Sequence, residues 1–252
     1  MSLLKRIHPE QPLKELRWFD IGIVTLIMFG QFIVRSTQMY LASLSPNLST
    51  AVSETATNTA SEGAAYSSNF TLQIILLALA IIYLWIRHFD FKQLPIRLKW
   101  SVHFWVPFIF AIMGLFADMV STLSGQYNYF SPQVLAFISP MAVIDKFMAL
   151  SPMAIAYALL NGFYEEFFFL GLLTSVKDKY KWLVLLFSTI VRVSFHTYQG
   201  MLWALVIGVV FGLLYYFLYK YKVKNLLPFF LVHALADMFG SSLIYLLVNW
   251  NY

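Results

Sequence analysis

Six ionisable side chains lie in otherwise apolar stretches of the second half of the chain: Glu165, Glu166, Arg192, His196, His233 and Asp237. Titratable groups are costly inside a lipid bilayer, so those found in apolar helices usually mark a functional site. The two glutamates are adjacent in LNGFYEEFFFLG, and consecutive side chains of a helix diverge by about 100°. One carboxylate can therefore face a water molecule while the other orients a neighbouring group. The structural alternative is an ion pair between one glutamate and Arg192.

The remaining four residues repeat one spacing. Arg192 and His196 are four apart in VRVSFHTYQG, and His233 and Asp237 are four apart in LVHALADMFG. Residues four apart share one face of a helix. An isolated intramembrane histidine is often a packing group, but two such pairs and a double glutamate indicate a reaction centre. We expect the polar HTYQG sequence to interrupt the helix after His196 and to line a cavity, where a membrane protein tolerates irregular backbone.

These residue types favour hydrolysis by an activated water molecule. The chain has no cysteine, and no serine is convincingly paired with a base, so water activated by a carboxylate and a histidine is the natural nucleophile. His233 and Asp237 could stabilise the oxyanion of a tetrahedral intermediate. Glu165, His196 and His233 could equally hold zinc with one open position, although the HExxH helix motif is absent. The sequence leaves open whether the cofactor is zinc or none is required.

The composition places these residues in a membrane. Hydrophobic residues make up 60% of the chain and charged residues 12%, whereas about a quarter of the residues of a soluble domain are charged. We predict an all-α, polytopic transmembrane helix bundle of about seven spans, because seven apolar runs approach the ~20 residues that cross the hydrocarbon core. The runs are 18–41, 70–86, 101–123, 150–175, 182–197, 200–219 and 226–248. Residues 132–148 are interpreted as an interfacial helix, and as a span they would make eight.

The basic residues predict the orientation. Most of the 17 Lys and Arg residues lie in alternate loops: Lys5, Arg6, Lys14 and Arg17 before the first span, Arg87, Lys92, Arg97 and Lys99 after the second, Lys177, Lys179 and Lys181 after the fourth, and Lys220, Lys222 and Lys224 after the sixth. The positive-inside rule then predicts a multi-pass protein of the cell membrane with a cytoplasmic N-terminus. The net charge of +5 is thus no sign of nucleic-acid binding. Residues 43–69 lack Lys and Arg and predict a flexible extracytoplasmic loop.

Other features are interpreted as structural. Arg35 and Asp118 are further intramembrane charges and could pair with each other. Gly208 and Gly212, in GVVFG, have the spacing that allows close helix packing. Residues 1–125 are interpreted as an N-terminal cytoplasmic segment with accessory transmembrane helices, and 148–250 as the functional membrane core.

The three motifs resemble those of the CPBP family of intramembrane proteases, which includes CAAX prenyl endopeptidases and bacteriocin-processing and self-immunity (Abi-like) proteins. The family pattern is a double Glu separated by three residues from an Arg, then a His preceded four residues earlier by Phe, then a His followed four residues later by Asn or Asp. The chain has EEFFFLG, RVSFH and HALAD in that order. The resemblance implies a CAAX-endopeptidase-like core in which Glu165 activates water with His196, Glu166 is the second carboxylate, and His233 and Asp237 form the oxyanion-side pair. Both glutamate-type and metalloprotease descriptions exist for the family.

The chain departs from the family pattern at two positions. Leu170 stands where the family usually has Arg, and Arg192 stands where it usually has Phe. A buried carboxylate pair without a cation would be costly. We therefore expect the guanidinium to have moved to the neighbouring helix and to pair with Glu166. If it does not, the chain is a degenerate member that binds a partner without cleaving it.

The expected function is hydrolysis of a peptide bond in a small hydrophobic or membrane-associated peptide, such as a bacteriocin, a pheromone precursor or a CAAX-like tail. The partners would be membrane lipid and a hydrophobic peptide or membrane-protein substrate. Two alternatives remain: a non-catalytic immunity or scaffold protein with the same fold, and a proton-coupled transporter whose buried Glu and His residues relay protons.

Overall fold

A computed structural model describes residues 11–45 and 62–249, and all regular secondary structure in these residues is helical. The chain divides into two compact units, each made of segments distant in sequence. Unit 1 comprises residues 1–96 and 164–226, and unit 2 comprises residues 97–163 and 227–252. The two units are defined by how the residues pack and not by function. The functional division at residues 125 and 148 stays a prediction.

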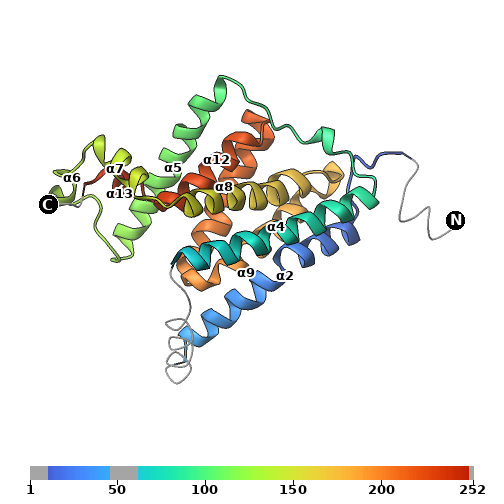
Figure 1. The fold of residues 1–252 in the computed structure, drawn as a ribbon, viewed down its shortest axis with the longest axis horizontal. Helices are drawn as coiled ribbons and strands as arrows, with labels where there is room; N and C mark the ends of the chain where they lie inside the picture. The colour runs from blue at the N-terminus through green and yellow to red at the C-terminus, as the bar shows by residue number, and fades with distance from the viewer. Residues whose placement is uncertain (1–10, 46–61, 250–252) are drawn as a thin grey trace. The chain divides into compact units, whose positions relative to one another are not determined.

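Unit 1 is organised around α2 (Trp18–Ser43), which packs against α4 (Glu62–Ile86) and α9 (Lys181–His196) (Figure 1). Apolar residues at helical spacing give α2 a buried face, with Ile21, Val24, Met28 and Phe29 almost fully enclosed. Phe29 lies 4.8 to 5.6 Å, between ring centroids, from four aromatic rings of unit 1: Tyr164, Phe168, Phe169 and Phe195. The first apolar helix, interpreted from sequence as accessory, is therefore part of the packing around the motif residues of unit 1.

One end of unit 1 is fixed by a buried ion pair. Arg87, counted above as a loop cation, is 2% exposed, and its Nε lies 2.6 Å from Oδ1 of Asp20, which is fully buried. The same Asp20 oxygen accepts a 2.7 Å hydrogen bond from the Tyr83 hydroxyl. Arg87 follows the end of α4, as the sequence predicted, and its charge neutralises a carboxylate on the adjacent helix.

The remaining helix of unit 1 runs continuously over Met201–Val223. It comprises α10 (Met201–Leu205), the π-helical turn η5 (Val206–Phe211), α11 (Gly212–Leu218) and the π-helical turn η6 (Tyr219–Val223). A Cβ atom added at Gly208 would lie 2.8 Å from the backbone nitrogen of Val193 on α9. Gly208 of GVVFG thus acts in packing, as predicted, because the absence of a side chain lets two helix backbones touch. Short 3₁₀ turns, η1 (Phe91–Gln93) and η3 (Asp178–Tyr180), belong to the connections.

Unit 2 contains α5 (Ser101–Leu123), α6 (Pro132–Leu135), α7 (Met141–Ala149), most of α8 (Pro152–Glu166), α12 (Leu227–Phe239) and α13 (Leu243–Leu247). Asp118 of α5 is fully buried and accepts hydrogen bonds from the Ser242 hydroxyl and, at 2.9 Å, from the Ile244 backbone nitrogen. Arg35 has an exposed side chain. Asp118 thus caps the first turn of α13, and the suggested Arg35–Asp118 pair, whose members belong to different units, stays a prediction.

Several apolar helices support a multi-pass membrane protein, but the described residues do not establish seven spans. Four helices are long and apolar enough to cross a membrane: α2, residues 64–86 of α4, α5 and the Met201–Val223 helix. A fifth candidate combines α7 with Pro152–Leu172, bent by 101° as a broken span or re-entrant loop. The run at 226–248 is not one helix, because α12 ends at Phe239 and Gly240 has a positive φ of 77°. Of the predicted loop at 43–69, residues 46–61 lie outside the described residues, and α4 already begins at Glu62.

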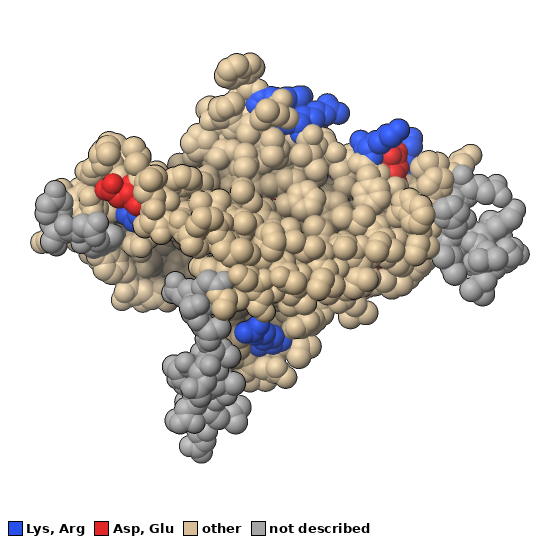
Figure 2. Space-filling view, viewed as in Figure 1, with Lys and Arg blue, Asp and Glu red and all other residues tan. Residues whose placement is uncertain are grey.

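The surface agrees with a lipid environment. Figure 2 shows a face that is mostly neither acidic nor basic, with the charged side chains confined to a few small patches. Large apolar side chains are exposed along the candidate spans, for example Leu26 at 72%, Trp85 at 73% and Leu123 at 80%. Such exposure is unfavourable in water and favourable in hydrocarbon.

Candidate active site

The best-defined part of the candidate site is an ion pair between Glu166 and Arg192 within unit 1. Nη1 and Nη2 of Arg192 donate to Oε1 and Oε2 of Glu166 at 2.8 and 3.1 Å. Glu166 is fully buried and Arg192 is 3% exposed. The ion pair expected from the sequence is therefore present. A bidentate Arg–carboxylate pair is the geometry in which mutual attraction best offsets the cost of burying both charges.

The neighbourhood of Arg192 is shaped to hold a guanidinium group. The guanidinium carbon lies 4.0 Å from the centroid of the Phe169 ring, a cation–π contact. On another side, a Cβ atom at Gly212 would come within 3.4 Å of Cδ of Arg192. The aromatic residue follows the double glutamate closely in sequence and the glycine belongs to GVVFG. Both therefore support the cation at its position on α9.

His196, at the C-terminal end of α9, is 6% exposed, and its Nδ1 lies 2.8 Å from the carbonyl oxygen of Arg192. Because a carbonyl can only accept a hydrogen bond, Nδ1 must carry the proton. In the neutral ring Nε2 is then the basic nitrogen. The i,i+4 relation noted in the sequence thus fixes the histidine tautomer through the backbone of Arg192.

The helix break after His196 is held by α2. The residues Thr197–Gln199 form a 3₁₀ turn, η4, followed by Gly200 with φ of 86°, so the predicted interruption of the helix is present. The buried Ser36 hydroxyl lies 2.9 Å from the Thr197 hydroxyl and accepts a 2.9 Å hydrogen bond from the backbone nitrogen of Tyr198. Sequence reasoning missed Ser36, because a serine in an apolar helix carries no charge and often bonds only to its own helix.

Glu165, the expected water-activating carboxylate, is 5% exposed and ends α8 together with Glu166. Directly after them the chain enters the π-helical turn η2 (Phe167–Leu172), in which Leu173 donates its backbone N–H to Phe168, five residues earlier. Such turns insert an extra residue into a helix and occur frequently at functional sites. The π-helical turn was not predicted, because EEFFFLG has the same apolar character as an ordinary helix.

In unit 2, α12 carries His233 and Asp237 one helical turn apart, with Nε2 of His233 3.9 Å from Oδ1 of Asp237. The other oxygen of Asp237 accepts a 2.8 Å hydrogen bond from Nδ2 of Asn161 on α8. A Cβ atom at Gly162 would lie 2.4 Å from the Phe230 carbonyl oxygen of α12, so only glycine allows this approach of the two helices. Asn161 is thus a further polar residue of the site. Its place four residues before Glu165 was the sequence signal that could have found it.

The comparisons with known proteins bear on this set of residues. Residues 147–239 match the family Type II CAAX prenyl endopeptidase Rce1-like. The match supports the resemblance to CAAX-type intramembrane proteases, and the Rce1-like region includes all six ionisable residues singled out in the sequence as well as Asn161. No curated protein and no solved structure matched the chain.

The predicted site residues within the Rce1-like region belong to both units. Glu165, Glu166, Arg192 and His196 belong to unit 1, and His233 and Asp237 belong to unit 2 with Asn161. Within each unit the contacts are the ones described above. The catalytic roles of these residues, and the zinc set of Glu165, His196 and His233, stay predictions.

Proposed function

We propose that the protein is an intramembrane endopeptidase that hydrolyses a peptide bond of a small hydrophobic or membrane-associated peptide. The observation that carries the proposal is the Rce1-like match, which spans the double glutamate and both histidine motifs. It is supported by the bidentate Arg192–Glu166 pair, which supplies the buried cation that the departure at Leu170 would otherwise remove. The protein would act in the cell membrane with its N-terminus in the cytoplasm.

The two adjacent carboxylates would have different tasks. Glu166 is paired with Arg192, and this ion pair would hold the end of α8 against α9. Glu165 would take a proton from water, and the oxygen of that water would attack the carbonyl carbon of the scissile bond. Nε2 of His196 is oriented as a base and would share in this proton transfer. The proton would then pass to the leaving amine as the tetrahedral intermediate collapses.

The developing negative charge would be met by the residues of α12. His233 would donate a hydrogen bond to the oxyanion, and Asp237 would hold its ring in orientation. Asn161 would in turn fix Asp237 through the 2.8 Å hydrogen bond. Preorganised donors of this kind are typically among the largest contributions to catalysis of acyl transfer.

The direct test is incubation of the purified protein with candidate hydrophobic peptides in lipid nanodiscs, followed by mass spectrometry of the products. We expect cleavage by the native protein and a loss of at least about 100-fold in rate for Glu165→Gln and His196→Ala. Each reaction is run with and without a chelator, which separates a metal-dependent from a metal-independent hydrolysis. Full cleavage by Glu165→Gln would overturn the assigned mechanism.

Leu170 favours one second candidate, a non-catalytic immunity or scaffold protein with the same fold. A protein of that kind would give no product with any peptide. Its cellular function would also survive Glu165→Gln and His196→Ala at normal abundance. The two functions are therefore separated by the same pair of variants.

A further inference from the structure

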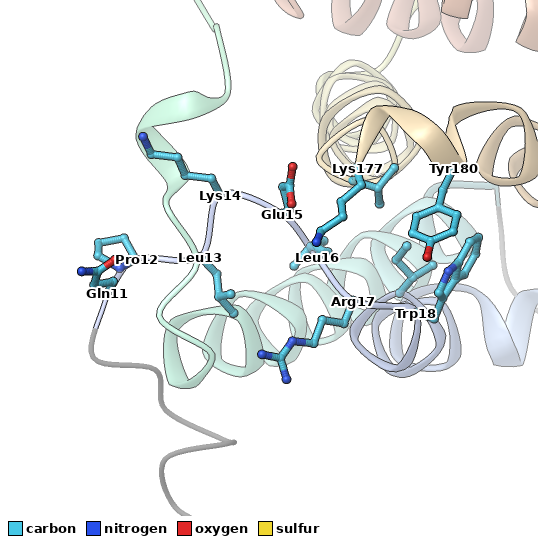
Figure 3. A pocket seen from close by; sticks show the side chains of 12 residues that line it. Gln11, Pro12, Leu13, Lys14, Glu15, Leu16, Arg17, Trp18, Lys177 and Tyr180 are labelled. Carbon is cyan, nitrogen blue, oxygen red and sulfur yellow. The ribbon is translucent and has the colours of Figure 1, made fainter. Parts of the chain in front are cut away.

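Unit 1 contains a cavity of about 680 Å³ beside the start of α2, and the proposed peptidase chemistry does not use it. It is lined by residues 11–18 and 21, together with Val176, Lys177 and Tyr180, and Figure 3 shows most of these side chains. We propose that this cavity binds the phosphate group of an anionic lipid headgroup. The inference concerns a separate place in unit 1 and does not depend on the peptidase activity.

The charge of the lining favours an anion. Three cationic side chains, Lys14, Arg17 and Lys177, line the cavity together with one acidic residue, Glu15. Among the described residues, none of these three cations forms an ion pair. Nearby acidic groups are already occupied, since Asp20 binds Arg87 at 2.6 Å. The cavity therefore has an excess of positive charge, which a phosphate would neutralise.

Asp178, next to the cavity, is likewise occupied. Its carboxylate lies 3.4 Å from Nζ of Lys181 and 3.9 Å from Nζ of Lys220. Lys177, which precedes Asp178 in the chain, lines the cavity and is not one of the lysines paired with that carboxylate.

The wall that carries Lys14 and Arg17 is fixed in position although it is not helical. Leu13 donates its backbone N–H to His88 at 2.8 Å and accepts one from Asp90 at 3.0 Å. Leu16 donates to the Ser175 carbonyl at 2.7 Å. These bonds hold the segment between the end of α4 and the chain that follows η2. A preorganised wall costs little entropy when a ligand binds.

Two aromatic residues place the cavity at the membrane surface. Trp18 and Tyr180 pack edge to face with ring centroids 5.9 Å apart, and both side chains are partly exposed at 40% and 36%. In Figure 3 they lie side by side at one end of the lining. Tryptophan and tyrosine concentrate at the level of lipid headgroups. Basic residues beside such a pair are placed to meet a lipid phosphate and not a ligand deep in the bilayer.

The test compares lipid retention by the purified full-length protein using native mass spectrometry. The protein is reconstituted with phosphatidylcholine containing a minor fraction of phosphatidylglycerol. We expect preferential retention of phosphatidylglycerol, and a drop of about tenfold or more in its apparent affinity in the double variant Arg17→Gln, Lys177→Gln. The matched control, Lys92→Gln with Lys222→Gln, removes two exposed lysines of unit 1 that do not line the cavity. It should retain the lipid.

Further measurements separate specific lipid binding from misfolding, from binding of a free anion and from general attraction to anionic lipid. The charge-preserving variant Arg17→Lys, Lys177→Arg should restore retention, which separates lost charge from misfolding. Inorganic phosphate added to the detergent-solubilised protein distinguishes a free anion from a lipid: stabilisation by phosphate alone, without lipid preference, would overturn the lipid assignment. Equal losses in the cavity variant and the control would show only general attraction between basic residues and anionic lipid, and would also overturn it.

Discussion

Arg192 contacts Glu166 with two nitrogens and covers the Phe169 ring, so one side chain both pairs with the carboxylate and fills the space above an aromatic residue of η2. Both partners are buried. The pair therefore has more influence on the integrity of unit 1 than a surface ion pair, which contributes about 0 to 1 kcal/mol.

Removal of the cation alone should destabilise the protein. Arg192→Leu leaves the Glu166 carboxylate buried without its charge partner, and we expect a loss of about 3–5 kcal/mol. Thermal unfolding in detergent measures it. The double variant Arg192→Leu, Glu166→Leu should recover most of the loss, because no unpaired charge remains. An Arg192→Leu protein as stable as the native one would contradict this account.

Moving the guanidinium back to the family position tests whether its location or only its charge matters. In Leu170→Arg, Arg192→Phe the cation lies on the same helical segment as Glu166, as in the family pattern. We expect peptide cleavage to return to at least a measurable fraction of the native rate, whereas Arg192→Phe alone should be inactive. Failure of the double variant to exceed the single one would indicate that α9 must carry the charge.

Asn161 is predicted to act through Asp237. Asn161→Ala removes the 2.8 Å hydrogen bond to the carboxylate, and we expect kcat to fall about tenfold with little change in KM. Asn161→Gln, which keeps the amide, should recover part of the rate. A pH profile of cleavage adds a readout that a merely structural residue would not move, because an Asp237 carboxylate without this hydrogen bond no longer has a fixed position beside His233.

Gly162 should not tolerate a side chain. In Gly162→Ala the new Cβ meets the Phe230 carbonyl oxygen at 2.4 Å, and backbone atoms on both helices must shift. We expect overpacking to cost about 1–3 kcal/mol and to weaken the Asn161–Asp237 contact. The control is Gly22→Ala on α2, where a Cβ meets nothing within 4 Å and stability should rise slightly.

Ser36 is predicted to position the turn after His196. Ser36→Ala removes the acceptor of the Tyr198 N–H and the partner of the Thr197 hydroxyl, at a cost of about 1–3 kcal/mol. The exposed Ser43, whose hydroxyl bonds only to the Tyr40 carbonyl of its own helix, provides the matched control. Faster hydrogen exchange confined to residues 197–200 in Ser36→Ala would support the assignment. Unchanged exchange there would contradict it.

Contacts could be predicted from the sequence where burial of an unpaired charge would cost much free energy. The Arg192–Glu166 pair could be predicted because a buried double glutamate needs a cation and only one was in reach on the neighbouring helix. The helix break at HTYQG and the packing role of Gly208 followed from local composition. These features are determined by nearby residues or by a strong energetic penalty.

The features that were missed depend on contacts that sequence spacing does not encode. Ser36 reaches Thr197 from a helix at the other end of the chain, and a lone serine carries little penalty that would single it out. The role of Asp118 was missed because the capping of α13 by a residue on α5 is a tertiary contact. The helix break at Gly240 and the bend before α8 were also missed, since apolar runs do not reveal them, and the number of spans stays a prediction.

The packing of α2 against α9 also has a consequence for the order of events during synthesis. The ribosome completes α2 at Ser43 and α9 only at His196, about 150 residues later, which at roughly 5–20 residues per second takes on the order of ten seconds. During this interval the Asp20–Arg87 pair can already join α2 to α4, but Ser36 and Phe29 wait for their partners. A hairpin of α2 and α4 is thus the expected assembly intermediate, in which the face of α2 that later packs on α9 is still uncovered.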